Sequence, residues 1–155
     1  MNTALLLAGG TGSRLSAEVP KQYLSIRGRM LITYALEPLL ESRFIDTVVI
    51  VAEQRWMEPI LQDARQAGLS TEKISGFAIP GSNRQSSILN GLEDILCRRS
   101  GKVNREDAED TDTVLVHDAA RPLISGKLIA SCYAALGGHD GVMPVLPMKD
   151  TVYLS

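Results

Sequence analysis

The chain has 155 residues, of which 45% are hydrophobic and 22% charged, and its formal net charge is −2. This size and composition are typical of a single globular domain with a substantial core. The slightly negative charge gives no electrostatic support for binding to nucleic acid or to an anionic membrane surface. Any phosphate group must therefore be bound by a few individually placed cations.

Neither a membrane span nor a disulfide framework is expected. The apolar run Ala4–Ala8 is far too short to cross a membrane, and no positively charged segment precedes it. We therefore expect a cytoplasmic protein. The two cysteines, Cys97 and Cys132, lack metal-binding spacing and lie within helix-like apolar patterns, so we expect them to be buried free thiols.

Strand and helix patterns alternate along the chain. Short apolar or β-branched runs predict parallel strands, and apolar residues recurring every three or four positions predict helices. In chain order, the predicted elements are a strand at Ala4–Ala8, a helix at 30–42, a strand at Thr47–Val51, a helix at Trp56–Ala67, a strand at Ile74–Ile79, a helix at 84–99, a polar surface loop at 101–112, a strand at Thr113–Val116, a helix at 125–136 and a strand at Gly141–Val145. We expect Pro38 to bend or shorten its helix, Gly68 to end one and Ser125 to cap another. This order predicts one α/β domain, residues 1–155, with three layers and a mostly parallel, Rossmann-like sheet.

A glycine-rich loop follows the first predicted strand, in the stretch LLLAGGTGSRL. It is not a dinucleotide-binding fingerprint, because Leu15 stands where a third glycine should follow Gly10 and Gly12. It is not a Walker A loop either, because the nearby lysine, Lys21, does not follow a glycine. The small residues allow backbone N–H groups to approach a phosphate, and Arg14 and Lys21 are two cations that can close over it.

Four clusters of small and polar residues each follow a predicted strand. They are AGGTGSR after the first strand, PGSNRQSSILNG after the third, HDAARP after the fourth and PMKDT after the fifth. Each cluster alone is also compatible with an ordinary turn. In an open parallel sheet, however, ligands bind outside the carboxyl ends of the strands, so the joint placement of the clusters predicts one binding site there.

Five ordered motifs, LLAGGTGSRL, PKQYL, GSNRQSSILNGL, VLVHDAARP and PVLPMKDT, resemble those of cytidylyltransferases that act on small polyol phosphates. The resemblance is to the 2-C-methyl-D-erythritol 4-phosphate cytidylyltransferase family of the non-mevalonate isoprenoid pathway, and it covers almost the whole chain. It implies the nucleotide-diphospho-sugar transferase type of Rossmann-like sheet. Ribitol-5-phosphate cytidylyltransferases carry a similar set, and Gly9 and Trp56 are more typical of them. Because the sequence of Asp118–Pro122 matches the motif of the erythritol enzymes, we favour the erythritol substrate.

The resemblance implies transfer of CMP from CTP to the polyol phosphate, with release of pyrophosphate and with Mg²⁺ bound to the triphosphate. The substrate phosphate attacks the α-phosphorus, and it is already ionised near neutral pH, so no strong general base is required. The site must supply positioning and compensation of negative charge. By resemblance, Arg14 and Lys21 bind the triphosphate, and Asp118 lies between ribose and substrate, where it can hold the metal ion indirectly.

The other expected contacts concern the nucleotide and the polyol phosphate. Ser87 is expected to offer its hydroxyl to the base, whereas Ser82 stands where the family often has an acidic residue near the ribose. Arg84 either has a structural role in its loop or contacts the ligand, and Arg121 is either an ion-pair partner of Asp118 or a ligand of the polyol phosphate. The expected nucleotide-binding set is Ala8, Gly9, Gly10, Gly12, Gly81, Ser82, Arg84, Ser87 and Ala119, and the substrate-binding set is Arg121, Asp150 and Thr151.

Family members continue beyond the motif that contains Asp150 and Thr151. By resemblance, an arm that pairs with a second subunit follows, and then a last strand and a phosphate-binding lysine. We therefore expect a truncated domain that forms a homodimer when full length. Three functions stay open: CTP-dependent transfer, CTP binding without turnover and, least favoured, a regulatory α/β domain without a nucleotide. We assign no catalytic part to His117, expected at the core edge with a hydrogen bond, or to His139, expected in a turn.

Overall fold

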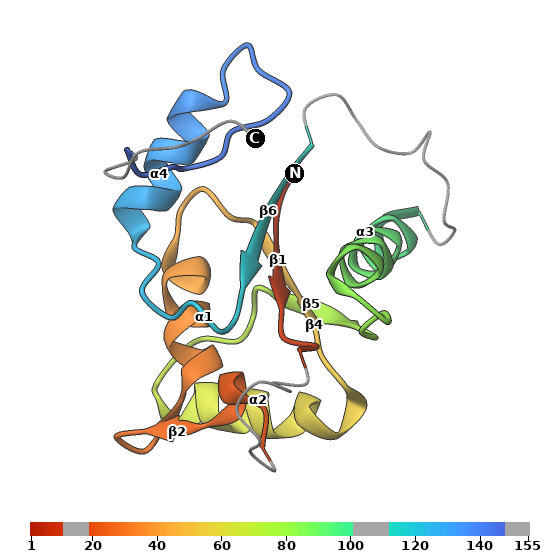
Figure 1. The fold of residues 1–155 in the computed structure, drawn as a ribbon, viewed down its shortest axis with the longest axis vertical. Coiled ribbons are helices and arrows are strands. Elements are labelled where there is room, and N and C mark those ends of the chain that lie inside the picture. The colour runs from red at the N-terminus through yellow and green to blue at the C-terminus, as the bar shows by residue number, and fades with distance from the viewer. Residues whose placement is uncertain (11–18, 101–111, 148–155) are drawn as a thin grey trace, which may run out of the picture.

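The computed structural model of the protein describes residues 1–10, 19–100 and 112–147. Its centre is a parallel sheet with the strand order β5-β4-β1-β6 (Figure 1). The strands are β1 (Asn2–Leu7), β4 (Thr47–Val51), β5 (Ile74–Ala78) and β6 (Thr113–Asp118). Strand β1 pairs with β4 on one side and with β6 on the other, so Leu5 lies between Val49 and Val116. The predicted parallel sheet is thus confirmed.

Helices cover both faces of this sheet. They are α1 (Leu31–Glu41), α2 (Gln54–Gln66), α3 (Arg84–Ser100) and α4 (Gly126–Ala135). Apolar side chains of α1, α2 and α4 pack in one core with Ala4 and Leu6 of β1, whereas α3 packs against Leu5 on the opposite face. Figure 1 shows α3 on one side of the sheet and α1 and α4 on the other, which confirms the three layers. In the part of the chain that the structure describes, none of these helices is long and apolar enough to cross a membrane.

The central strands are continuously apolar because both of their faces are covered. Leu5 and Leu6 point to opposite faces, and both are 0% exposed. Helix α3 approaches β1 so closely that a Cβ atom at Gly91 would lie 2.4 Å from Leu5 Cδ1. The middle of α3 is therefore packed tightly on the middle of β1.

The predicted helix ends are confirmed at two positions. Gly68 has a φ of +78° and its N–H bonds the carbonyl of Arg65 at 2.9 Å, so it ends α2 in the left-handed conformation. Ser125 caps α4 by accepting a hydrogen bond from the backbone N–H of Leu128 at 3.2 Å. Helix α1 continues through Pro38 to Glu41, so this proline does not end it.

A 3-10 turn and a small hairpin between β1 and α1 were not predicted. They consist of η1 (Lys21–Tyr23), β2 (Ser25–Ile26) and the antiparallel β3 (Arg29–Met30). The hairpin turn places Arg27 at φ 54° and Gly28 at φ 77°, as a two-residue type I′ turn requires. Arginine rarely adopts a positive φ, so the sequence carried little signal for this turn.

Two predictions are wrong. Residues 141–147 form no strand and are all exposed, although a strand is predicted at Gly141–Val145. Pro144 has no N–H to donate to a sheet ladder, so this segment would lose a ladder bond at that residue if it paired with β6. Cys97 is exposed and Cys132 half-buried, and both are free thiols. Cys97 lies two residues past Ile95, which packs on the sheet, so Cys97 points away from it.

Candidate functional site

The segments after β1, β5 and β6 meet at the carboxyl edge of the sheet. The segment after β1 contacts the segment after β5 where Gly9 packs on Pro80. The segment after β5 reaches the end of β6, where Arg84 Nε lies 3.1 Å from Asp118 Oδ1. Three of the four predicted clusters are therefore brought together. The predicted site residues that lie outside the described part of the chain are Gly12, Arg14, Asp150 and Thr151.

The backbone of the loop Ala8–Gly10 is held by neighbouring residues. The N–H of Ala8 donates to the carbonyl of Val51 at 2.8 Å. The carbonyl of Ala8 accepts from Gln22 Nε2 at 2.6 Å and from the Tyr23 hydroxyl at 2.8 Å, and the carbonyl of Gly10 accepts from Gln22 Nε2 at 2.7 Å. Both polar backbone groups of Ala8 are thus used within the protein. The nucleotide contacts expected for Ala8, Gly9 and Gly10 stay predictions.

Gly9 and Gly10 differ in what surrounds them. A Cβ atom on Gly9 would lie 2.4 Å from Cβ and 2.7 Å from Cγ of Pro80, so the proline ring fills the space that a side chain would need. A Cβ atom on Gly10 would meet no atom of the described residues within 4 Å. The N–H groups of both glycines donate to no other described residue. Gly9 therefore has no room for a side chain, whereas the N–H groups of both glycines are without a described partner.

The side chain of Tyr23 links this loop to helix α2. It stacks on Trp56 with 4.0 Å between ring centroids and 12° between planes. Tyr23 is 5% exposed, and burial raises the pKa of its hydroxyl well above the usual range, so the hydroxyl stays protonated and remains a donor. Trp56, a residue more typical of the ribitol enzymes, thus has a packing role: it stacks on the tyrosine whose hydroxyl holds the loop.

The amino end of α3 is closed by a reciprocal cap that the sequence analysis missed. Asn83 Oδ1 accepts from the Ser86 N–H at 2.9 Å, while Ser86 Oγ accepts from the Asn83 N–H at 3.0 Å. The available signal in the sequence was the spacing Asn-x-x-Ser, in which serine takes the fourth position that glutamate usually occupies in such a cap. Ser87 Oγ donates to the Asn83 carbonyl at 2.8 Å and accepts from the Gly81 N–H at 3.0 Å. The hydroxyl predicted to contact the base therefore shapes the turn.

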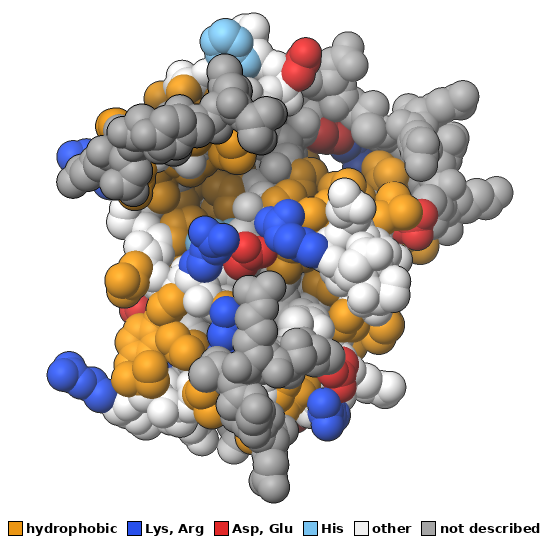
Figure 2. Space-filling view, in the orientation of Figure 1, with side chains coloured by type: hydrophobic (Ala, Val, Ile, Leu, Met, Phe, Trp, Pro, Cys, Tyr) orange, Lys and Arg blue, Asp and Glu red, His pale blue; other side chains and the backbone are white. Residues whose placement is uncertain are grey.

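A carboxylate between two arginines lies at the end of β6. Asp118 Oδ1 is 3.1 Å from Arg84 Nε, and Asp118 Oδ2 is 3.2 Å from Arg121 Nε. The arginine side chains are 60% and 78% exposed, and that of Asp118 is 29% exposed. Figure 2 shows an acidic side chain flanked by basic ones near the middle of the face. This cluster carries a net charge of +1 and opens to solvent, which suits an anionic ligand.

Two other predicted residues complete the edge. Ala119 is 0% exposed, and its N–H donates to the Leu7 carbonyl at 2.9 Å, so it fixes the end of β6 against β1. Lys21 is exposed at the start of η1, beside the buried Gln22 that holds the glycine loop. The ligand contacts predicted for Lys21 and Ala119 stay predictions.

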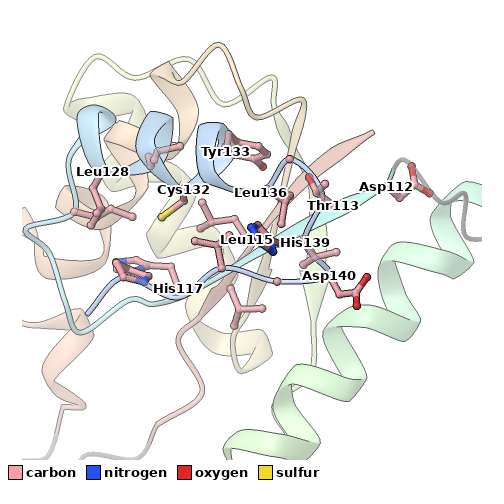
Figure 3. A pocket seen from close by; sticks show the side chains of 18 of the residues that line it. Asp112, Thr113, Leu115, His117, Leu128, Cys132, Tyr133, Leu136, His139 and Asp140 are labelled. Carbon is pink, nitrogen blue, oxygen red and sulfur yellow. The ribbon is translucent and has the colours of Figure 1, made fainter. Parts of the chain in front are cut away.

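A hollow lies beside β6, next to the Asp118 cluster, because His117, which precedes Asp118, lines it. Its volume is about 920 Å³, and it is lined mainly by β6, α4 and residues 137–144. Figure 3 shows His117, Leu128 and Cys132 around it. His117 Nε2 bonds the Arg121 carbonyl at 2.9 Å, as expected for a histidine at the core edge, and burial lowers its pKa. Of the predicted ligand residues that the structure describes, none lines this hollow.

Known proteins with similar sequences are cytidylyltransferases. The family model described as "IspD: 2-C-methyl-D-erythritol 4-phosphate cytidylyltransferase" matches residues 3–155. The enzyme of that name from Lachnospira eligens is 31% identical over 152 residues, which are 98% of this chain and 60% of the relative. The one from Thermotoga neapolitana is 41% identical over 129 residues, which are 83% of this chain and 51% of the relative. A ribitol-5-phosphate cytidylyltransferase from Vibrio parahaemolyticus is 32% identical over 156 residues, with 99% and 60% covered.

Solved structures show the same fold. The 4-diphosphocytidyl-2C-methyl-D-erythritol synthase from Anaerococcus prevotii superposes with a TM-score of 0.69 at 24% identity, covering 99% of this chain and 58% of that one. The chain thus spans between about half and three fifths of the length of these relatives. On the match over residues 3–155, this chain belongs to the 2-C-methyl-D-erythritol 4-phosphate cytidylyltransferase family.

Proposed function

We propose that this chain forms the CTP-binding part of an enzyme that transfers CMP from CTP to 2-C-methyl-D-erythritol 4-phosphate and releases pyrophosphate. The observation that carries the proposal is the meeting of three segments at one sheet edge, in a chain that matches the family over residues 3–155. These segments hold the glycine backbone, the capped amino end of α3 and the Asp118 cluster.

The chemistry fits groups that position and neutralise charge. The phosphate oxygen of the polyol phosphate forms a bond to the α-phosphorus of CTP, and the bond from that phosphorus to the pyrophosphate oxygen breaks. A phosphate monoester is ionised near neutral pH, so no side chain needs to remove a proton. Gly9 and Gly10 lie at the same sheet edge as the amino end of α3, and their N–H groups bond no described residue, so this edge favours an anionic or hydrogen-bond-accepting ligand.

Cationic side chains compensate the negative charge in this proposal. Lys21 is exposed on the three-residue turn η1, which is tied to the glycine loop through Gln22. Arg84 and Arg121 share one carboxylate, so the cluster keeps a positive excess even while paired. Ion pairs this exposed are weak, so either arginine can turn toward a phosphate at small cost.

A magnesium ion is part of the proposal, and the donor set is compatible with one held mainly by substrate oxygens. No group of three or more His, Cys, Asp or Glu side chains in the described residues forms a metal cage. Asp118 is a single carboxylate beside the site, and Mg²⁺ typically uses one or two carboxylates together with phosphate oxygens and water. When bound, the ion would neutralise triphosphate charge, and Asp118 would contact it directly or through water.

The choice of polyol phosphate is also proposed. Gly9 and Trp56 resemble the ribitol enzymes, but each has a packing partner in this structure, Pro80 for Gly9 and Tyr23 for Trp56. These two residues therefore carry little information on the polyol. The sequence of Asp118–Pro122, which matches the motif of the erythritol enzymes, supports the erythritol substrate. Ribitol 5-phosphate remains the alternative, because the Vibrio relative of that name is 32% identical over 99% of this chain.

Pyrophosphate release from CTP tests the proposal. The protein is incubated with Mg²⁺, CTP and either 2-C-methyl-D-erythritol 4-phosphate, ribitol 5-phosphate or no acceptor, with a full-length relative as the positive control. We expect release with the erythritol phosphate above the other two arms. Release only with ribitol 5-phosphate would identify ribitol 5-phosphate as the substrate in place of the erythritol phosphate. Calorimetric binding of CTP without any release would support a nucleotide-binding unit without turnover, and neither binding nor release would refute the proposal.

Two further parts of the proposal are a homodimeric enzyme, which the family resemblance supports, and a cytoplasmic location, which the short apolar run Ala4–Ala8 supports. Light scattering of the purified protein tests the first, and fractionation of the producing cells tests the second.

A further inference from the structure

The buried amide of Gln22 and the hydroxyl of Tyr23 hold the glycine loop by its carbonyl groups. We propose that these two residues are positioning residues that set the preference for cytosine over uracil by fixing the direction of the Ala8–Gly9 peptide. This inference rests on the proposed function, in which the loop meets the base of CTP.

The two side chains place three donor contacts on two carbonyl oxygens. Gln22 Nε2 donates to Ala8 O at 2.6 Å and to Gly10 O at 2.7 Å, so both N–H groups of the amide are used. The Tyr23 hydroxyl is 2.8 Å from the same Ala8 oxygen, which thereby uses both lone pairs. Gln22 is 3% exposed and Tyr23 is 5% exposed, and both bonds to the Ala8 oxygen are buried, so water does not compete for those two bonds. An apolar residue would fill this buried position without the cost of burying an amide, which indicates that the donors themselves matter.

Fixing a carbonyl also fixes the N–H of the same peptide. In a planar trans peptide the C=O and N–H point in opposite directions, so the Gly9 N–H points away from Gln22 and Tyr23. Glycine allows many backbone conformations, and without these bonds the peptide between Ala8 and Gly9 can rotate more freely. No described residue accepts from the Gly9 N–H, so it is available to a ligand.

The direction of this peptide distinguishes the two pyrimidines. Cytosine has an unprotonated N3 that accepts a hydrogen bond, whereas uracil has an N3–H that donates one. A peptide held with its N–H toward the base favours cytosine, and a rotated peptide that presents its carbonyl favours uracil. Loss of the Gln22 and Tyr23 donors should therefore weaken CTP binding and reduce discrimination against UTP.

The experiment measures the dissociation constants of CTP and UTP by calorimetry for the protein and three variants. Gln22→Leu removes both amide donors at similar volume, and Tyr23→Phe removes one donor while it keeps the ring on Trp56. Thr3→Val is the matched control, because Thr3 is 2% exposed and bonds Thr47 at 3.1 Å near the opposite end of β1. Thermal unfolding of each variant shows whether it is folded at the temperature of the titration.

We expect Gln22→Leu to weaken CTP binding about tenfold and Tyr23→Phe about threefold, since Gln22 still holds Ala8 in the second variant. UTP binding should change less, so the CTP-to-UTP preference falls in both variants and stays constant in Thr3→Val. A constant preference in folded Gln22→Leu and Tyr23→Phe proteins would overturn the inference, whether or not their overall affinity drops. If Gln22→Leu does not fold, the Tyr23→Phe result decides alone. Failure of the unaltered protein to bind CTP would instead refute the proposed function, and the inference with it.

Discussion

Replacement of Asp118 by asparagine separates the structural from the functional contribution of the carboxylate between the two arginines. The substitution keeps the size of the side chain and one oxygen acceptor but removes the charge shared by Arg84 and Arg121. Each of these pairs involves an arginine that is more than half exposed. Exposed ion pairs contribute about 0.2–1 kcal/mol each, so we expect the free energy of unfolding to fall by about 1 kcal/mol. For a domain of this size, that corresponds to a decrease in Tm of roughly 2–4 °C.

The expected effect on function is much larger than the effect on stability. If Asp118 orients charge at the reacting phosphates, its loss should lower pyrophosphate release by about 10²–10³-fold, as for other preorganised charge contacts. Asp94→Asn is the matched control, because Asp94 also pairs with an arginine, Arg98, on α3 and has a similar side-chain exposure of 22%. Thermal unfolding and pyrophosphate release are measured for both variants.

Two results would refute this reasoning. Asp118→Asn that retains nearly full turnover would show that the carboxylate has no part in the reaction. A loss of several kcal/mol in stability, with turnover falling only as far as the folded fraction, would show that the ion pairs hold the fold and that their exposed geometry is misleading.

Three further predictions concern Lys21, Gly9 and His117. Lys21→Ala should lower turnover by about 10²-fold while changing the unfolding free energy by less than about 0.5 kcal/mol, because the side chain is exposed; equal losses in both assays would count against a triphosphate contact. Gly9→Ala should destabilise the fold by about 1–3 kcal/mol in urea unfolding because its Cβ would lie 2.4 Å from Pro80 Cβ, and Pro80→Gly should relieve part of this loss; additive effects would contradict the packing account. Burial lowers the pKa of His117 below its ordinary 6.5, so the unfolded chain binds the proton more readily, and the stability contributed by neutral His117 is lost as pH falls below about 6.5. The urea-unfolding free energy should therefore decrease more between pH 7.5 and 5 in the protein than in His117→Gln, and parallel pH profiles would contradict the assignment.

The fold was predictable where a residue pattern has one structural solution. The apolar runs of β1 and β4 are continuous because both faces of the sheet are covered, so Leu5 and Leu6, which point to opposite faces, are both buried. The strand expected at Gly141–Val145 failed because an apolar run specifies a strand only when a neighbouring strand accepts its N–H groups, and Pro144 lacks one. The type I′ turn at Arg27 was not visible because its residue type does not signal a positive φ.

The candidate site was likewise predictable only in part. The positions that follow strands were predictable, since the ends of parallel strands meet at one edge, and the ion pair of Arg121 with Asp118 was one of the two roles expected for Arg121. The roles of Gln22, Asn83 and Ser86 were not predicted, because a side chain that holds backbone carbonyls or caps a helix is recognised only when those groups are placed in space. Spacing along the chain does not give that placement.

A crystal structure of the protein with CTP and Mg²⁺ would locate the nucleotide directly. We expect the cytosine against the backbone of Gly9 and Gly10, and the phosphates near Lys21 and the Asp118 cluster at the carboxyl edge of the sheet. CTP in the hollow between β6 and α4, or no CTP at a concentration that saturates the full-length relatives, would contradict this expectation.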